Sequence, residues 1–296
     1  MKNFVGELQY FMKYPRKQLD LWAYKLKKHR VNYYSKVPNS FAFNPCTKPS
    51  VIIIIPVYNN YSWTLKCLYS IKKNIKNIDY KIIIADDSST DKTKVITKYI
   101  KNIEVIRTSE NGGFLKNCNN ALKNLSLVGG GADYIWLLNN DTQVLPGALE
   151  SMLDVFNKHG DAGAVGSKLI YPNGLLQEAG GIIYKDANGC NYGRMRNRLD
   201  AEYNYLKEVD YCSGASLLLK KSIMDELGGF DERFAPAYYE ETDLCFRIRE
   251  KGYKVYYQPL SEVVHFESIS LKNSHDELMK INRNKFLTKW HDVLLR

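Results

Sequence analysis

The sequence predicts an α/β fold with a Rossmann-like, mostly parallel central sheet and helices on both faces. Uncharged, β-branched runs such as residues 51–55 are typical of strands that are covered on both faces. These runs alternate with segments of helical spacing, which indicates parallel strands joined by crossover helices. Polar clusters follow several of the runs, at the edge where open α/β sheets bind ligands.

The first half of the chain accounts for the parallel part of the sheet. Strands are expected at residues 51–55, 81–85 and 103–106, and in the apolar run that stops at Asn139. Helices are expected at residues 62–77, through residues 95–100, and at 114–125. Strand and helix alternate throughout, so a doubly wound sheet follows.

The second half is less regular. Strands are expected at residues 165–170, 180–184, 216–219 and 254–257, and helices at 222–227 and 241–251. The polar, Arg- and Tyr-rich stretch 185–208 is expected to be a loop. The predicted organisation is a helical extension and linker at residues 1–48, a catalytic domain at 49–270 and a C-terminal helix at 271–296.

Composition limits the class of protein. The 296 residues are 45% hydrophobic, and the 42 basic against 32 acidic residues give a net charge of +10. That charge favours an anionic partner. Six scattered cysteines with no Cys-x-x-Cys pair argue against zinc and against a disulfide framework. No run reaches the roughly 18 apolar residues of a membrane span, and no signal-peptide core is present, so a cytoplasmic location is expected.

Residues 1–36 hold much of the positive charge. Nine basic and two acidic residues give this segment a net charge of +7, and apolar residues recur at helical spacing around Pro15. A basic amphipathic helix suits an anionic membrane surface, which would make the protein peripheral at the inner face of the cell membrane. A helix docked on the main domain explains the pattern equally well. Nucleic acid is not an expected partner, because no nucleic-acid-binding motif accompanies the charge.

Four polar clusters follow the predicted strands of the first half. They are Tyr58 with Asn59, Asp86 with Asp87, Asn111 with Gly112 and Gly113, and Asn139 with Asn140 and Asp141. Each cluster alone is also ordinary turn chemistry. Together they would converge on one crevice, where an aspartate could bind a base or ribose and the glycines would allow close approach of a nucleotide. There is no Gly-x-Gly-x-x-Gly fingerprint and no Walker loop, so neither NAD nor a P-loop ATP is expected.

The cluster around Asp141 has the chemistry of a hard-metal site. One carboxylate and two amides suit Mg²⁺ or Mn²⁺ rather than zinc. His265, after an apolar strand, is either structural or a further ligand of that site. A second acidic group, Glu240 and Glu241, follows aromatic residues that would raise a carboxyl pKa and shape a sugar pocket. The alternative is an acidic first turn of a helix, favoured by the helix dipole.

A series of motifs in order along the chain is more specific. They are residues 54–59 (IIPVYN), 86–91 (DDSSTD), 111–119 (NGGF with Asn119), 137–142 (LLNNDT), 212–215 (CSGA), 228–232 (GGFDE), 238–247 (YYEETDLCFR) and 263–265 (VVH). The series resembles family 2 glycosyltransferases, most closely the bacterial rhamnosyltransferase-like branch. The resemblance implies the GT-A fold, a nucleotide-diphosphate sugar donor such as a UDP- or dTDP-sugar, Mn²⁺ or Mg²⁺, and inversion at the anomeric carbon. It also implies a glycan or lipid-linked glycan acceptor, in bacterial surface polysaccharide synthesis.

The resemblance also assigns roles to residues. Asp141 matches the metal-binding aspartate, with Asn139 in place of that motif's first aspartate, and His265 matches a metal- or diphosphate-binding histidine. Glu241 matches the catalytic base. Asp87, or alternatively Asp86, matches the nucleoside-binding acid. Donor binding is further expected of Pro56, Tyr58, Asn111, Gly113, Asn119 and Asn140, and the acceptor side of Ser213, Gly214, Tyr239 and Glu240.

Two other functions fit parts of the pattern. A non-catalytic nucleotide-sugar-binding subunit would not need both Asp141 and Glu241, and both are present. A sugar nucleotidyltransferase would carry a Gly-rich, basic loop near the first strand, and residues 56–59 are not such a loop. Because fold alone does not separate these classes, the choice depends on the site residues, and they favour a glycosyltransferase.

Overall fold

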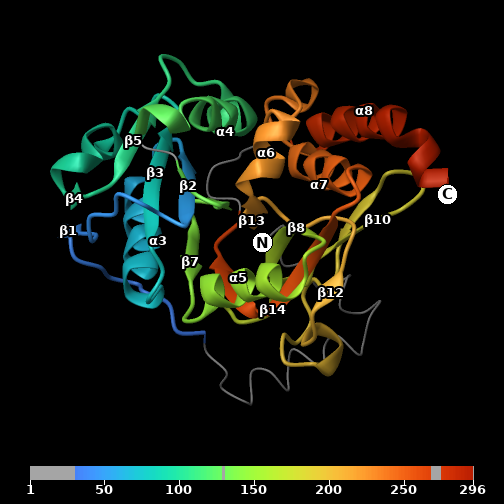
Figure 1. The fold of residues 1–296 in the computed structure, drawn as a ribbon, viewed down its shortest axis with the longest axis horizontal. Coiled ribbons are helices and arrows are strands. Elements are labelled where there is room, and N and C mark those ends of the chain that lie inside the picture. Colours follow the sequence, from blue (N-terminus) through green and yellow to red (C-terminus); the bar gives the residue numbers. More distant parts are fainter. Residues whose placement is uncertain (1–30, 129–130, 268–274, 296) are drawn as a thin grey trace, which may run out of the picture.

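The computed structural model describes residues 31–128, 131–267 and 275–295 (Figure 1). Its parallel strands are β2 (Val51–Val57), β3 (Tyr80–Asp86), β5 (Glu104–Arg107) and β6 (Tyr134–Leu138). They lie in the order β5-β3-β2-β6, with β2 parallel to β3 and β6. The predicted parallel half of the sheet is confirmed. Of the predicted basic extension, residues 1–30 lie outside the described part of the chain.

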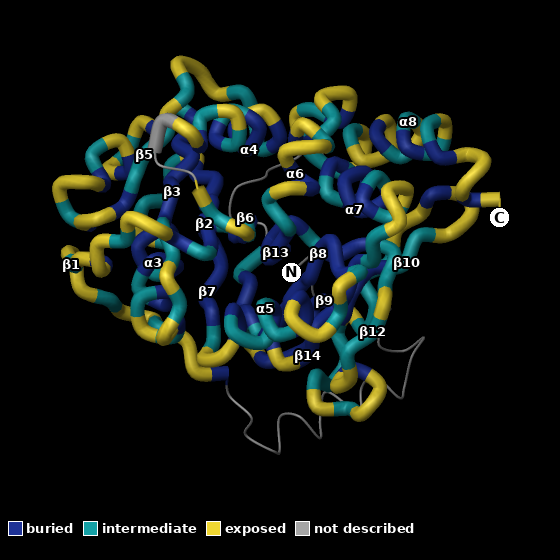
Figure 2. Tube along the Cα trace, in the orientation of Figure 1, coloured by how far each residue is buried: buried dark blue, intermediate teal, exposed yellow. Residues whose placement is uncertain are grey.

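Helices cover both faces of the sheet (Figure 1). They are α3 (Tyr61–Asn74), α4 (Gly113–Lys123), α5 (Ala148–Lys158), α6 (Lys221–Leu227), α7 (Glu240–Glu250) and α8 (His275–Leu295). Side chains alternate along a strand. In β2, Ile52 and Ile54 join the core under α4, α6, α7 and α8, whereas Ile53 and Ile55 join the core under α3 and α5. In Figure 2 the central strands are therefore buried, while the outer faces of the helices are exposed.

The second half extends the sheet with mixed directions. The additional strands are β7 (Thr142–Val144), β8 (Ala162–Ile170), β9 (Leu176–Glu178), β12 (Lys207–Glu208), β13 (Ser216–Lys220) and β14 (Lys254–His265). β13 lies between β6 and β8 and is antiparallel to both, and β14 is parallel to β8. The strand predicted at 254–257 is thus much longer. It shifts register between Gln258 and Glu262, around Pro259, and proline in sheets is found at such irregularities.

Other segments depart from the prediction in detail. The expected helix through residues 95–100 is the 3-10 segment η1 (Lys92–Lys98), which is interrupted at Val95 and ends before the short strand β4 (Ile100–Lys101). β4 pairs with β1 (Phe41–Ala42), so backbone pairing ties the expected linker to the domain. The expected loop 185–208 contains β11 (Gly189–Asn191), paired with β10 (Gly181–Ile183), and η3 (Ala201–Tyr203). The remaining 3-10 segments are η2 (Leu125–Val128) and η4 (Glu232–Phe234).

The last helix packs onto the domain. Phe286 and Trp290 of α8 are buried in the same core as α7, and Asn282 donates to the backbone oxygens of Phe234 and Ala237 at 2.8 Å each. Among the residues that the structure describes, no helix is both long and apolar enough to cross a membrane.

Candidate functional site

A cavity of about 550 Å³ opens where β2, β3 and β6 end. It contains most of the residues that the sequence singles out. They are Pro56, Tyr58, Asp87, Asn111, Gly113, Asn139, Asn140, Asp141, Ser213, Gly214, Glu240, Glu241 and His265. Three of the expected residues, Asp86, Asn119 and Tyr239, do not line it. The four strand-end clusters therefore do converge on one edge of the sheet, as a parallel sheet requires.

The two candidate nucleoside acids have different surroundings. Asp86 is buried and forms an ion pair with Arg107, its register partner on β5, and it accepts a hydrogen bond from the Ser89 backbone N–H at 2.9 Å. Asp87 faces the cavity and accepts the backbone N–H groups of Gly112 and Gly113, each at 2.9 Å. The structure thus separates the alternatives: Asp86 holds the scaffold, and Asp87 joins the end of β3 to the glycine loop in the cavity.

Gly113 needs to be glycine at its position. Its φ is +82°, and a Cβ there would lie 2.8 Å from the Cβ of Pro236, which also lines the cavity. Only glycine combines that backbone conformation with so close an approach. The loop that Asp87 binds is therefore packed closely against Pro236, another residue of the cavity wall.

Asp141 and His265 meet at the other side of the cavity. β14 pairs with β7 so that His265 lies opposite Thr142, and His265 Nε2 is 3.2 Å from Asp141 Oδ1. The two residues are only 8% and 9% exposed. Nearby, the Asn139 side-chain oxygen is buried without a hydrogen-bond partner, whereas the Asn140 amide donates to Thr64 Oγ1 at 3.0 Å. The pairing of β7 with β14 brings together residues that are 124 positions apart in the sequence.

These groups suit a divalent ion that a substrate helps to hold. Among the described residues there is no group of three or more His, Cys, Asp or Glu side chains that could bind a metal. Asp141, His265 and the orphaned oxygen of Asn139 offer an incomplete set. Mg²⁺ and similar ions are commonly held through one or two protein carboxylates, with substrate phosphates and water filling the other positions. The donor set therefore fits such an ion.

Two buried carboxyls begin α7. Glu240 and Glu241 line the cavity, and each has a buried side-chain oxygen, Oε2, without a hydrogen-bond partner. Burial raises the pKa of both carboxyls, and for Glu240 the adjacent Glu241 raises it further. A backbone hydrogen bond from Gly214 to Glu241 acts in the opposite direction. A carboxyl of raised pKa, with a free oxygen in a cavity, is equipped to accept a proton.

Their neighbours on α7 have structural contacts. Asp243 is fully buried and is held by Arg247 at 2.9 Å, Lys289 at 2.7 Å and the indole N–H of Trp290 at 2.8 Å. The hydroxyl of Tyr239 donates to the Ala187 oxygen at 2.7 Å, away from the cavity, and Tyr238 lines the cavity instead. At the start of α7, Asp243 is thus paired and has a structural role. Glu240 and Glu241 each keep an oxygen without a partner and line the cavity.

Asn119 also has a structural contact set. Its amide donates to the Phe230 oxygen at 2.9 Å, and its oxygen accepts the Phe230 N–H at 2.8 Å. Both ends of the side chain are therefore used to hold the turn at residues 228–230 against α4.

Two polar residues of β9 are near the site although the sequence did not single them out. Gln177 Oε1 is 3.1 Å from His265 Nδ1, and Glu178 accepts the Ser213 N–H at 2.8 Å. Burial raises the pKa of Glu178 to about 7, and Glu241 adds to the effect. Glu178 thus binds the backbone of Ser213, next to Gly214, which lines the cavity with Glu241. The available signal was a polar pair in the otherwise apolar segment 175–179.

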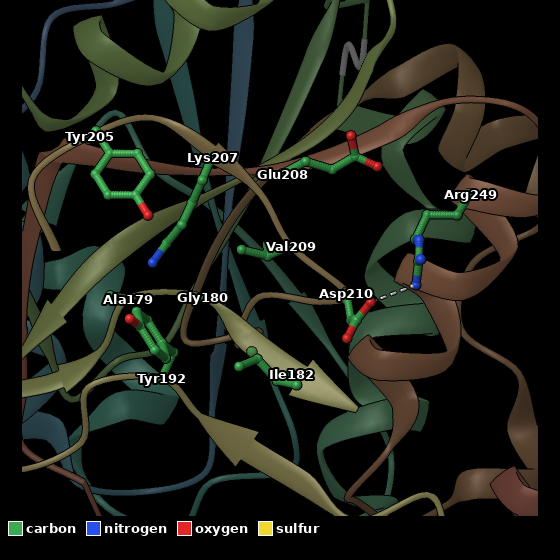
Figure 3. A pocket seen from close by; sticks show the side chains of 11 residues that line it. Ala179, Gly180, Ile182, Tyr192, Tyr205, Lys207, Glu208, Val209, Asp210 and Arg249 are labelled. Atoms are coloured by element: carbon green, nitrogen blue, oxygen red, sulfur yellow. Dashed lines mark ion pairs between the residues drawn. The ribbon is translucent and has the colours of Figure 1, made fainter. Parts of the chain in front are cut away.

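A second cavity, of about 410 Å³, lies beside β10 and β12 (Figure 3). Its charged groups already have partners: Asp210 pairs with Arg249 at 3.2 Å, and Glu208 with Lys254 at 3.6 Å. The Lys207 ammonium lies 3.9 Å from the ring centre of Tyr192. No set of unpaired polar groups converges there among the residues that line it, so the first cavity is the candidate site.

The fold and the cavity define a class: an α/β protein with acidic and amide side chains at the edge of its sheet and two buried carboxyls in the same cavity. Residues 52–228 match the family model described as glycosyl transferase family 2. The chain belongs to that family, and the resemblance seen in the motifs is confirmed.

Relatives in sequence include rhamnosyltransferases. The chain is 27% identical over 207 residues to the N-acetylglucosaminyl-diphospho-decaprenol L-rhamnosyltransferase of Mycobacterium tuberculosis, covering 64% of this chain and 67% of that one. It is 28% identical over 223 residues to the O-antigen chain rhamnosyltransferase WbaN of Salmonella anatum, covering 73% and 66%. It is 26% identical to the uncharacterized protein y4gI of Sinorhizobium fredii, of which the match spans only 25%.

Solved structures share the fold. One is a crystal structure of GalNAc-T7 with UDP, GalNAc and Mn²⁺, with a TM-score of 0.59 and 15% identity over 74% of this chain and 44% of that chain. Another is the mannosyltransferase PcManGT from Pyrobaculum calidifontis in complex with GDP-Man and Mn²⁺, with a TM-score of 0.52 and 14% identity over 88% and 67%. The predicted GT-A fold is confirmed.

Proposed function

We propose that this glycosyltransferase is an inverting, divalent-metal-dependent enzyme. It moves a sugar from a nucleotide-diphosphate donor to a hydroxyl of a glycan or lipid-linked glycan acceptor. One observation carries the proposal: a single cavity joins the Asp141–His265 pair to the buried, unpartnered oxygen of Glu241. Donor phosphates bound at the Asp141–His265 pair and an acceptor hydroxyl bound at Glu241 would place the anomeric carbon of the donor sugar between the two groups.

The donor side is assigned to the ends of β3 and β6. Asp87 and the glycine loop provide hydrogen-bonding groups and close backbone approach for the nucleoside. Asp141 and His265, with the Asn139 oxygen, would hold the ion. When bound, Mn²⁺ or Mg²⁺ would act as a Lewis acid that neutralises the charge of the departing diphosphate.

The proton transfer is assigned to Glu241. Its carboxylate takes the proton of the acceptor hydroxyl while that oxygen forms a bond to the anomeric carbon. The bond from this carbon to the diphosphate oxygen breaks on the opposite face, so the configuration inverts. One base suffices, whereas glycoside hydrolysis uses two carboxylates. Burial supports this role, because it raises the pKa of the carboxyl and so strengthens the base.

The activities named for the relatives support a lipid-linked acceptor. Besides the decaprenol-linked rhamnosyltransferase, the chain is 25% identical over 216 residues to a GalNAc(5)-diNAcBac-PP-undecaprenol beta-1,3-glucosyltransferase of Campylobacter jejuni. Because an O-antigen rhamnosyltransferase is also among them, synthesis of a bacterial surface polysaccharide is the proposed setting. A UDP- or dTDP-sugar is the proposed donor. The inner face of the cell membrane is the proposed location.

The test is a donor panel. UDP-, dTDP- and GDP-sugars are offered with Mn²⁺ or Mg²⁺, with and without a polyprenyl-diphosphate-linked acceptor, and the release of nucleotide diphosphate is measured. Turnover should require the metal and stop in excess EDTA. Asp141→Ala should abolish metal-dependent turnover. Binding of a nucleotide sugar without any turnover across the panel would favour a non-catalytic binding subunit instead.

A further inference from the structure

The side chain of Gln177 contacts the back of His265. Gln177 lies in β9, is 2% exposed, and places Oε1 3.1 Å from His265 Nδ1. The other ring nitrogen, Nε2, faces Asp141 at 3.2 Å. The two ring nitrogens therefore have different neighbours, and only Asp141 belongs to the proposed metal site.

The oxygen of the Gln177 amide is the atom that faces the histidine. Both residues are buried, so the contact is made inside the protein.

The orientation of that amide decides the chemistry of the imidazole. An amide oxygen only accepts, so His265 Nδ1 must carry a proton. Nε2 is then the nitrogen that is free to bind a cation beside Asp141. A hydrogen bond to the outer ring nitrogen of a ligating histidine fixes its tautomer and ring orientation, and losing it commonly weakens metal binding about 10- to 100-fold.

We propose that Gln177 is a positioning residue for the metal site. The inference rests on the proposed metal role of Asp141 and His265. Gln177 touches neither donor nor acceptor in this arrangement, because it does not line the cavity. It acts through the histidine, by presenting Nε2 as the ligand.

The experiment measures Mn²⁺ binding to the full chain by electron paramagnetic resonance, without donor sugar. Gln177→Leu should weaken binding about 10- to 100-fold. Gln177→Glu keeps an acceptor at Nδ1 and should restore near-normal binding. The matched control is Gln258→Leu, at a buried glutamine on β14 that donates to the Ser151 oxygen at 3.0 Å, and it should leave Mn²⁺ binding unchanged.

A double-mutant comparison separates the inference from the proposed function. His265→Ala should weaken Mn²⁺ binding, and adding Gln177→Leu should cause no further loss, because the two residues act as one unit. If His265→Ala has no effect, the proposed metal role fails and the inference fails with it. If His265→Ala weakens binding but Gln177→Leu does not, the metal role stands and the inference is overturned. Equal losses in Gln177→Leu and Gln258→Leu would also overturn it, since the cause would be general damage to the core.

A second measurement does not depend on affinity. In the Mg²⁺-loaded protein, ¹⁵N chemical shifts of His265 should show a protonated Nδ1 and an unprotonated Nε2. The opposite tautomer would overturn the inference, because Gln177 would then not be accepting a proton from the ring.

Discussion

Replacing Glu178 by glutamine should change how the stability of the protein depends on pH. The carboxyl is 1% exposed, and one of its oxygens has no hydrogen-bond partner. Burial, with a smaller effect of Glu241, raises its pKa from 4.5 to about 7. Glutamine keeps an oxygen for the Ser213 N–H but does not ionise. Comparing the two proteins therefore reports the titration of this buried carboxyl together with its interaction with Glu241.

The sign and size follow from proton linkage. Between pH 4.5 and about 7 the folded carboxyl keeps its proton while the unfolded carboxyl has lost it. The folded state then binds more protons, so its stability falls as pH rises. Since one pKa unit is worth about 1.36 kcal/mol, the free energy of unfolding of the wild type should fall by roughly 3 kcal/mol relative to Glu178→Gln across this window.

The assay is urea denaturation of both proteins from about pH 4 to pH 8, with stability taken from the linear extrapolation. A constant offset between the two curves carries no information, because it includes the packing of the new amide. The change in the difference is the test. Glu110→Gln, at an exposed carboxylate, is the control and should follow the wild type at every pH. Curves for Glu178→Gln and wild type that stay parallel would refute the reasoning.

Four further outcomes are expected. Glu241→Gln should lower kcat by ~10²-fold or more with donor affinity nearly intact, measured by steady-state kinetics and donor titration. The wild-type rate should rise with pH through the raised pKa of Glu241, because the base must be ionised, and the kcat profile of residual activity in Glu241→Gln should lose that step. Asn119→Ala should lower the free energy of unfolding by about 2 kcal/mol, from two buried hydrogen bonds, without changing the donor KM. Pelleting with anionic liposomes should weaken at high salt and vanish when residues 1–36 are removed; equal pelleting of both proteins would contradict membrane contact by this segment.

The parallel half of the fold could be predicted because each strand is a continuous β-branched run that stops at polar residues. The later strands could not be bounded in the same way. In β14 the register shift around Pro259 interrupts the apolar pattern, so the sequence indicates only its first part. The helix expected at residues 95–100 fails for a related reason: apolar residues at helical spacing also suit a 3-10 segment that ends in a short strand.

The part of the site that lies at the ends of strands could be predicted from the sequence. Asp87, Asp141 and His265 lie in the cavity as expected, since sheet topology alone brings the first two to one edge. The choice between Asp86 and Asp87 depended on Arg107, whose pairing follows from the register of β3 and β5. The roles of Gln177 and Glu178 depended on tertiary contacts of a three-residue strand, and nothing local in the sequence specifies those contacts.

The buried acids show which part of the site is scaffold and which part is available for chemistry. Asp243 is as buried as any side chain in the protein, yet cations and an indole N–H satisfy it. Glu178, Glu240 and Glu241 each keep a buried oxygen without a partner, which lowers stability. Stable folds retain few such groups, and those that remain concentrate where function requires them. Of the three, Glu240 and Glu241 open into the cavity, where an acceptor hydroxyl can supply the missing partner.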